Sequence, residues 1–336
     1  MHEARHVQLI FNEFAQSRQI IATNGQTSRT CILPIATVEP IQNTNTASES
    51  NNTSVKHQLR LDVCIKITYG NYSDWMQVMH FMEWWLYAGA THVWVYRESA
   101  SPDVDVVLGY YQNVRRVLTV LPSSWDDNRR TKYAVQMLQI QDCNLRLSGH
   151  ADFVAHVDWD EYMVHHNASL NTKGYLLKHL EEDVESNPKH SAWLWERVYS
   201  VDFPSFPDYL LNQSVSDPQI AKTSTSLHES SIPIVQNYLT SLPHQELKVS
   251  KKLQSMAKFI VRPENILQQR LHGVIKYLRG KTKSERFERF LTLHMRRKRK
   301  FTNSFPPPDV NKMDNPLNMT YLDGRMIEIL RLIRQG

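Results

Sequence analysis

The clearest chemical signal in the sequence is a group of three acidic residues within four positions: Asp158, Asp160 and Glu161. They directly follow residues 153–157, an apolar run that predicts a buried strand. Crowded carboxylates repel one another, so such a group needs a cation or basic side chains beside it. Hard divalent ions such as Mg²⁺ and Mn²⁺ take oxygen ligands and leave coordination positions for phosphate. A cation held here would stabilise the charge that develops on a diphosphate leaving group. The alternative interpretation is an acidic turn that binds no metal.

The D-x-D spacing of Asp158 and Asp160 is a weak pattern by itself. Asp103 and Asp105 form a second D-x-D at the expected start of a helix, where acidic residues interact favourably with the helix dipole. What distinguishes Asp158 and Asp160 is their position at the end of an apolar strand, with a third acid directly after them.

Strands alternate with helices along the chain before the acidic group. Strand-like patterns cover residues 61–67, 93–96, 117–121 and 153–157, and helical patterns cover residues 76–88, 104–111 and 130–147. This alternation predicts an α/β fold with a mainly parallel sheet, and such sheets bind ligands at the carboxyl ends of their strands. The acidic group lies at such an end. Further strands are expected over residues 190–200, 258–263 and 290–294, and a short helix over residues 326–333.

The helix expected over residues 130–147 needs an apolar face toward the sheet. Its predicted inward stripe consists of Ala134, Met137, Leu138, Gln141 and Leu145. The helix begins with Arg129, Arg130 and Lys132, which lie near the ligand edge of the sheet and could contact phosphates, although a solvated helix start is an equally good interpretation.

Composition excludes several classes of protein. The chain has 336 residues, of which 41% are apolar and 22% charged, which argues against a wholly disordered, collagen-like or coiled-coil protein. No uncharged apolar stretch is long enough to span a bilayer, and residues 1–21 lack the unbroken apolar stretch of a signal peptide. We therefore expect either a protein that is not secreted or one whose anchor preceded Met1.

Basic residues concentrate in one stretch of the chain. The net charge is +5, but residues 276–300 alone hold eleven basic and two acidic residues, so the rest of the chain is slightly acidic. This pattern argues against a generally basic nucleic-acid binder.

Cysteine content and glycosylation motifs bear on the compartment. Cys31, Cys64 and Cys143 allow at most one disulfide, and the lack of C-x-x-C spacing argues against a structural zinc site. Sequons of the form N-x-S/T favour a secretory lumen; they begin at Asn51, Asn52, Asn71, Asn167, Asn212 and Asn318.

Several short motifs occur in one order along the chain. They are CIKITYG at 64–70, FMEWW at 81–85, GATHVWVY at 89–96, QIQDCNLR at 139–146, HVDWDEY at 156–162, KFIVRP at 258–263, Leu271-His272, and HMR at 294–296. Their order over residues 60–296 resembles glycosyltransferase family 92, a galactosyltransferase-like group with a GT-A fold. Two positions depart from the family pattern: Met295 replaces a tyrosine, and Asn144 replaces an apolar residue. The membrane anchor usual in the family is not seen either.

The resemblance implies a GT-A type, Rossmann-like sheet with an irregular α+β region on the acceptor side. It implies transfer of a hexose, galactose from UDP-galactose, onto a glycan acceptor with inversion, helped by Mn²⁺ or Mg²⁺. On this interpretation Asp158 and Asp160 hold the metal and the ribose and diphosphate of the donor. His294 is the first candidate for a further metal ligand and His272 the second. The implied compartment is the Golgi lumen or membrane. The protein would associate with a membrane only through an anchor that is not seen in this chain.

Other candidate residues follow from the same resemblance. Tyr69 and Gly70 end the first strand, where the family fold receives the uracil, although an ordinary turn is an equally good interpretation. An inverting transfer needs a base for the acceptor hydroxyl, and three acids in the acceptor-side segment are unresolved candidates: Glu196, Asp202 and Asp208. Trp193 and Trp195 could stack on sugars, but core packing explains them better.

Four segments are expected along the chain. They are an N-terminal stem or irregular wrap over 1–58, a nucleotide-sugar-binding half over 59–166, an acceptor-side half over 167–300, and a tail with a short helix over 301–336. Three other functions remain open: a nucleic-acid or anionic-surface binding protein using residues 276–300, a metal-dependent phosphoesterase, and an inactive transferase homologue.

Overall fold

A computed structural model describes the chain over ten ranges and a few residues near the C-terminus. The ranges are 6–10, 17–23, 28–34, 58–124, 129–165, 168–195, 198–202, 249–253, 258–285 and 290–296, and the further residues are Arg325, Met326, Glu328, Ile329 and Leu332. Residues 1–56 and 57–336 form two compact units, which are described separately below.

The first unit contains a three-stranded antiparallel sheet, in the order β1 (His6–Ile10), β2 (Ser17–Thr23) and β3 (Ser28–Pro34). Strand β3 pairs with β2 over its whole length. Part of the segment expected to be a stem or irregular wrap is therefore regular. None of its three strands was predicted; in β3, for example, the favourable residues Thr30 to Leu33 are too few to show a period of two.

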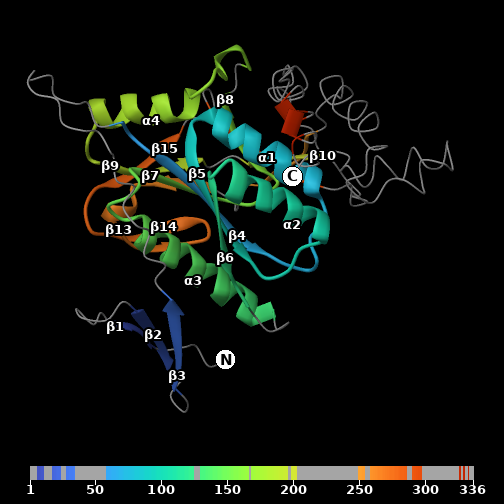
Figure 1. Ribbon diagram of the computed structural model, residues 1–336. Helices are drawn as coiled ribbons and strands as arrows, with labels where there is room; N and C mark the ends of the chain where they lie inside the picture. Colours follow the sequence, from blue (N-terminus) through green and yellow to red (C-terminus); the bar gives the residue numbers. More distant parts are fainter. Residues whose placement is uncertain are drawn as a thin grey trace, which may run out of the picture. The chain divides into compact units, whose positions relative to one another are not determined.

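The second unit is built on a seven-stranded sheet in the order β15-β9-β12-β7-β4-β5-β6. Figure 1 shows strands of this sheet, among them β4 and β5, beside the helices that pack on it. Its strands are β4 (Leu61–Thr68), β5 (Ala90–Arg97), β6 (Leu118–Pro122), β7 (Phe153–Val157), β9 (His190–Trp195), β12 (Lys258–Val261) and β15 (Lys281–Glu285). Strand β12 is antiparallel to both of its neighbours, and every other pair in the sheet is parallel. The predicted mainly parallel α/β sheet is confirmed.

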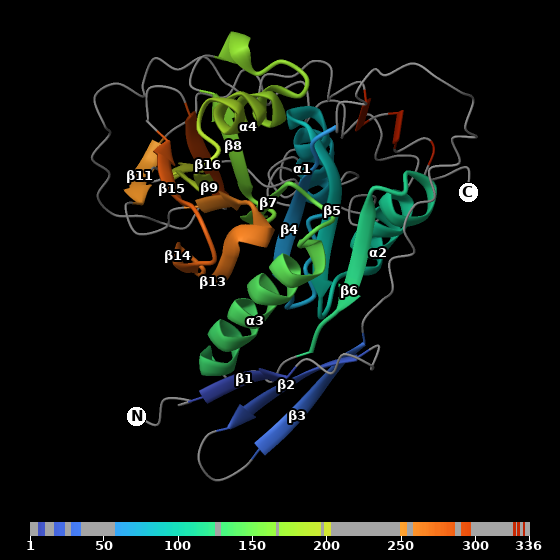
Figure 2. The same cartoon turned by 90° about the vertical axis from the view of Figure 1, so that its left-hand side faces the viewer.

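Helices cover both faces of this sheet (Figure 2). Helices α1 (Trp75–Ala88) and α2 (Pro102–Gly109) lie on one face, and α3 (Arg129–Leu147) lies on the other. A fourth helix, α4 (Tyr175–Ser186), was not predicted. It approaches the end of α1 so closely that a Cβ at Gly89, whose φ is +114°, would lie 2.7 Å from the Cβ of Leu177. No helix in the described ranges is both long enough and apolar enough to cross a membrane.

The inward face of α3 differs from the predicted stripe. Its buried residues are Gln139, Ile140, Cys143, Asn144 and Leu147, whereas Leu138 is 41% exposed. The prediction of this stripe was wrong because it assumed an apolar face, and two of the buried positions are amides with hydrogen-bond partners inside the protein.

Tryptophans pack the face of the sheet opposite α3. Trp84 and Trp85 of α1 are fully buried there, as are Trp193 and Trp195 of β9. Core packing is therefore the observed role of Trp193 and Trp195, as expected, because large aromatic side chains bury much apolar area.

A second, four-stranded sheet forms beside the end of β7, in the order β11 (Val249–Leu253), β10 (Val198–Asp202), β16 (Phe290–Arg296) and β8 (Glu161–His165). The strand expected over residues 190–200 is in fact two strands, β9 and β10, which belong to different sheets. Strand β16 is antiparallel to β8, with His294 opposite Glu161. This pairing brings a residue from the end of the chain to the acidic group.

The described residues of the expected C-terminal helix are helical, and one face of the helix belongs to the core. Met326 and Ile329 are fully buried in the cluster that contains α1. Arg325 Nε lies 3.7 Å from Glu83 Oε2 of that helix.

A disulfide joins Cys64 of β4 to Cys143 of α3, with Cα atoms 6.7 Å apart and a sequence separation of 79. We expect one reactive thiol, Cys31, in the denatured unreduced protein, three after reduction, and none in an unreduced Cys31→Ser variant. Because the bridge restricts the unfolded chain, the Cys64→Ala/Cys143→Ala variant should lose about 2–4 kcal/mol of unfolding free energy. Thiol counting tests the pairing, and urea unfolding tests the loss of stability. Three reactive thiols without reduction would contradict the pairing.

Candidate active site

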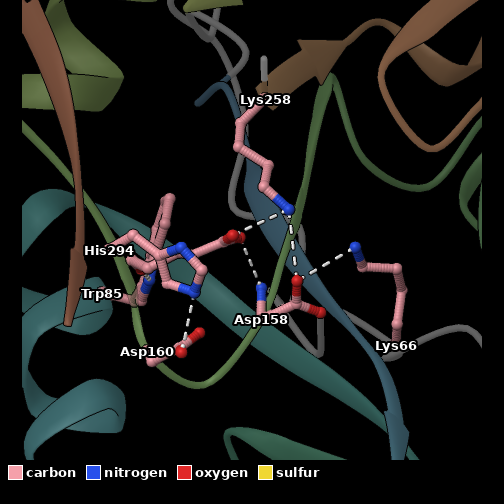
Figure 3. Close-up of polar contacts among 7 residues, drawn as sticks. Lys66, Trp85, Asp158, Asp160, Lys258 and His294 are labelled. Carbon is pink, nitrogen blue, oxygen red and sulfur yellow. Dashed lines mark hydrogen bonds and ion pairs between the residues drawn. The ribbon is translucent and has the colours of Figure 1, made fainter. Parts of the chain in front are cut away.

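The acidic group forms a closed turn between β7 and β8 (Figure 3). The backbone N–H of Glu161 donates to the carbonyl of Asp158 at 3.0 Å, and the Glu161 carboxylate accepts from the Asp158 N–H at 2.9 Å. Two buried indoles hold the turn from outside. Trp159 donates to Thr68 Oγ1 at 2.9 Å, and Trp85 donates to the Glu161 carbonyl at 3.3 Å. These bonds fix the backbone on both sides of Asp160.

Two buried lysines, which the sequence analysis missed, lie on either side of Asp158. The register pairs Ile65 with Val157 in β7 and Phe259 with His156, which places Lys66 and Lys258 beside the strand end. Both lysine Nζ atoms contact Asp158 Oδ2, Lys66 at 3.1 Å and Lys258 at 3.2 Å. The sequence did contain a signal for Lys66, because this lysine lies inside the otherwise apolar run 64–67. A charge that is buried with such a strand requires a partner of opposite charge.

The charges of this cluster are strongly coupled. Partial desolvation of its carboxylate would raise the pKa of Asp158, but Lys258 and Lys66 lower it well below its usual value. Burial raises the pKa of Glu161, against the opposing effect of Lys258. Burial would lower the pKa of Lys258, yet Asp158 and Glu161 raise it above its ordinary value. The lysines are thus integral to the electrostatics of the turn.

Asp160, at the tip of the turn, faces His294 of β16 and not the lysines (Figure 3). The distance from His294 Nε2 to Asp160 Oδ2 is 2.8 Å, and the side chains are 8% and 29% exposed. Together with Glu161, these residues place three potential ligand atoms within 4.8 Å of one another. A carboxylate and an imidazole suit Mn²⁺, so Asp160 and His294 fit a divalent cation with positions left for phosphate oxygens.

The other predicted metal residues have different surroundings. Asp158 is 41% exposed but is engaged by both lysines, and it is not among the three grouped ligand atoms. His272 lies in the turn between β13 (Ile266–Arg270) and β14 (Gly273–Tyr277), and it is not in that group either. Among the described residues, the structure thus brings together Asp160 and His294 from the predicted set.

The remaining predicted residues are only partly described. Tyr69 is 44% exposed and Gly70 has a φ of +70° just after β4, at the strand end that carries Lys66. Arg129 and Lys132 lie in the first turn of α3, but their side chains, like that of Arg130, lie outside the described residues. Two of the candidate bases, Glu196 and Asp208, also lie outside them. The third, Asp202, ends β10, where its backbone pairs with Arg296.

A pocket of about 490 Å³ lies at the carboxyl ends of β5 and β6. Its lining includes Arg97 and Glu98 from the end of β5, Pro122 and Ser123 from the end of β6, and Asp105 from α2. Arg97 donates two hydrogen bonds to Asp105, at 2.7 and 2.5 Å. The second D-x-D therefore contributes an ion pair to this pocket, and the pocket lies at the sheet edge where ligands of α/β proteins bind.

A buried polar network lies behind the turn on the α3 side. His156 Nε2 donates to Asn144 Oδ1 at 2.8 Å, and Asn144 Nδ2 donates to Gln269 Oε1 at 3.0 Å. This network explains why an amide occupies position 144. Burial, with the charges of Lys66 and Lys258, lowers the pKa of His156 to about 3.

The low pKa of His156 makes stability depend on pH. In the unfolded chain this imidazole takes a proton below its ordinary pKa of 6.5, whereas the folded protein keeps it neutral down to about pH 3. The unfolded state therefore binds more protons in that window, and stability is lost as the pH falls through it. We expect the unfolding free energy to fall by about 2 kcal/mol between pH 7 and pH 5 from this group. Urea unfolding should show a shallower pH dependence in His156→Gln; an equal dependence would contradict the assignment.

One of three comparisons with known proteins identifies a family. A model of glycosyltransferase family 92 matches residues 60–323. A search of curated proteins found no match. Similar solved structures include glucosyl-3-phosphoglycerate synthase from Mycobacterium tuberculosis with Mn²⁺, UDP and glucosyl-3-phosphoglycerate, at 8% identity and a TM-score of 0.29 over 62% of this chain. They also include the galactosyltransferase LgtC with donor and acceptor sugar analogues, at 11% identity and a TM-score of 0.28 over 60% of this chain. The chain covers 58% of the length of each of these structures.

Proposed function

Because the chain belongs to glycosyltransferase family 92, we propose that it is a metal-dependent transferase that moves galactose from UDP-galactose onto a glycan acceptor with inversion. The observation that supports metal dependence most strongly is the contact between Asp160 and His294 at the ligand edge of a GT-A sheet. These side chains come from distant segments and meet because β16 pairs with β8.

The proposed roles follow from the place of each residue. When bound, the cation would neutralise the negative charge that develops on the leaving diphosphate. Asp160 Oδ2 and His294 Nε2, which lie 2.8 Å apart, would hold it. Asp158, which both lysines contact, would interact with the ribose and diphosphate of the donor. Tyr69 and Gly70 receive the uracil, and Arg129 and Lys132 contact the phosphates.

The acceptor hydroxyl needs a base on the face opposite the leaving group. Glu196, Asp202 and Asp208 remain the proposed candidates. Asp202 has one feature in its favour: β10, which it ends, lies directly beside β16, the strand that carries His294.

The secretory pathway, Golgi lumen or membrane, is the proposed location. The disulfide between Cys64 and Cys143 supports an oxidising compartment, and the sequons agree with it.

The basic stretch at 276–300 does not need a separate function. Its described parts include β15, which is in the central sheet, and β16, which carries His294. Much of the stretch is therefore part of the framework of the proposed enzyme.

The full chain should be assayed with Mn²⁺, a panel of UDP-sugars and a panel of glycan acceptors. We expect transfer from UDP-galactose that chelation abolishes and Mn²⁺ restores, with the anomeric configuration inverted. Transfer from another UDP-sugar would show that the donor is not UDP-galactose. Transfer unaffected by chelation would refute metal dependence. Phosphodiester hydrolysis without an acceptor, or RNA binding with steep salt dependence and no transfer, would favour the other functions.

A further inference from the structure

The three acids of the turn have different partners. Both carboxylate oxygens of Glu161 are engaged, one by the Asp158 N–H at 2.9 Å and the other by Lys258 Nζ at 2.8 Å. Asp158 Oδ2 lies within 3.2 Å of two ammonium groups. Asp160 alone faces an imidazole.

From this arrangement we propose that Lys66 and Lys258 are permanent counter-ions of the turn, which hold Asp158 and Glu161 out of the cation's coordination shell. Asp160, with His294, is then left to bind the metal. The inference rests on the metal dependence proposed above and assigns the two lysines as positioning residues for that site.

Burial keeps both lysine side chains in place beside the turn. Lys66 is 6% exposed and Lys258 is 1% exposed, so neither ammonium can swing into solvent when a cation approaches. Glu161 is fully buried. A divalent ion placed on Asp158 would meet two ammonium groups at short range, where repulsion is much stronger than in water.

Charge balance gives the same division of roles. Two lysines offset two of the three carboxylates, so the turn carries a net charge of about −1 before any metal binds. Repulsion among three acids therefore does not by itself require a metal. It follows that the turn is already folded in the metal-free protein and that a metal binds to a site prepared in advance.

The test measures Mn²⁺ binding to the full chain, with free Mn²⁺ followed by electron paramagnetic resonance and no sugar nucleotide present. Three variants are compared with the wild type: Asp158→Asn, Asp160→Asn and Lys66→Met. Asp158→Asn and Asp160→Asn form a matched pair, because each removes one negative charge without changing the shape of the side chain. Circular dichroism of each metal-free variant establishes that it is folded.

We expect Asp160→Asn to weaken Mn²⁺ binding by at least about 10-fold and Asp158→Asn to change it by less than about 3-fold. Lys66→Met should tighten binding several-fold, because it removes a positive charge and partly frees Asp158. Equal losses in the two Asn variants, weaker binding in Lys66→Met, or no Mn²⁺ binding by the wild type would each overturn the proposal. The assay of sugar transfer is separate: a wild type that shows the expected binding pattern but transfers no sugar would refute the proposed function alone.

Discussion

Asp160→Asn is expected to reduce kcat for sugar transfer by about 10³-fold, the largest effect on activity of any change considered. The substitution keeps the shape of the side chain but removes the anionic oxygen that lies 2.8 Å from His294 Nε2. Without that ligand the cation is lost or misplaced, and the charge on the departing diphosphate loses its main stabilisation. Steady-state kinetics at saturating Mn²⁺ and donor measure the effect.

The second D-x-D provides a matched control for this prediction. Asp103→Asn makes the same chemical change in α2, away from the turn, and should leave kcat within about twofold and stability within about 1 kcal/mol. An Asp160→Asn enzyme that turns over at the wild-type rate would show that this carboxylate holds no catalytic metal.

Lys258→Met is expected to produce the largest loss of stability, about 3–5 kcal/mol. The side chains of Lys258 and Glu161 are 1% and 0% exposed, so removing the ammonium leaves a carboxylate buried without a counter-charge. The charge of Asp158 is destabilised less, because its side chain is 41% exposed and still contacts Lys66. Urea unfolding of the variant measures the loss.

A double-mutant cycle separates this effect from simple loss of packing. Glu161→Gln removes the second buried charge, so Lys258→Met/Glu161→Gln should recover most of the loss caused by Lys258→Met alone. Additive losses in the double variant would mean that the two groups are not coupled, and the counter-ion role of Lys258 would have to be abandoned.

The residues that the sequence predicted well are those with a local signal. The period-two pattern of residues 61–67 and the apolar run 153–157 predicted β4 and β7, and the ending of β7 predicted the place of the acids. His294 was found through the order of family motifs, since nothing near it in sequence points to a metal.

The residues that were missed depend on contacts between distant segments. Lys258 reaches Asp158 from 100 positions away, because β12 inserts antiparallel beside β7. The amide of Asn144 suggests a surface position on a helix, yet it is buried against His156 and Gln269. Such positions become recognisable only when the strand order is known.

We expect a divalent cation to bind at the tip of the turn between β7 and β8. The most direct measurement is anomalous diffraction from a crystal of the full chain grown with Mn²⁺ and UDP. We expect a manganese peak in contact with Asp160 and His294 and next to the diphosphate, with Asp158 still paired to Lys66 and Lys258. A peak on Asp158 and Glu161, or a diphosphate bound with no manganese beside it, would contradict a metal site formed by Asp160 and His294.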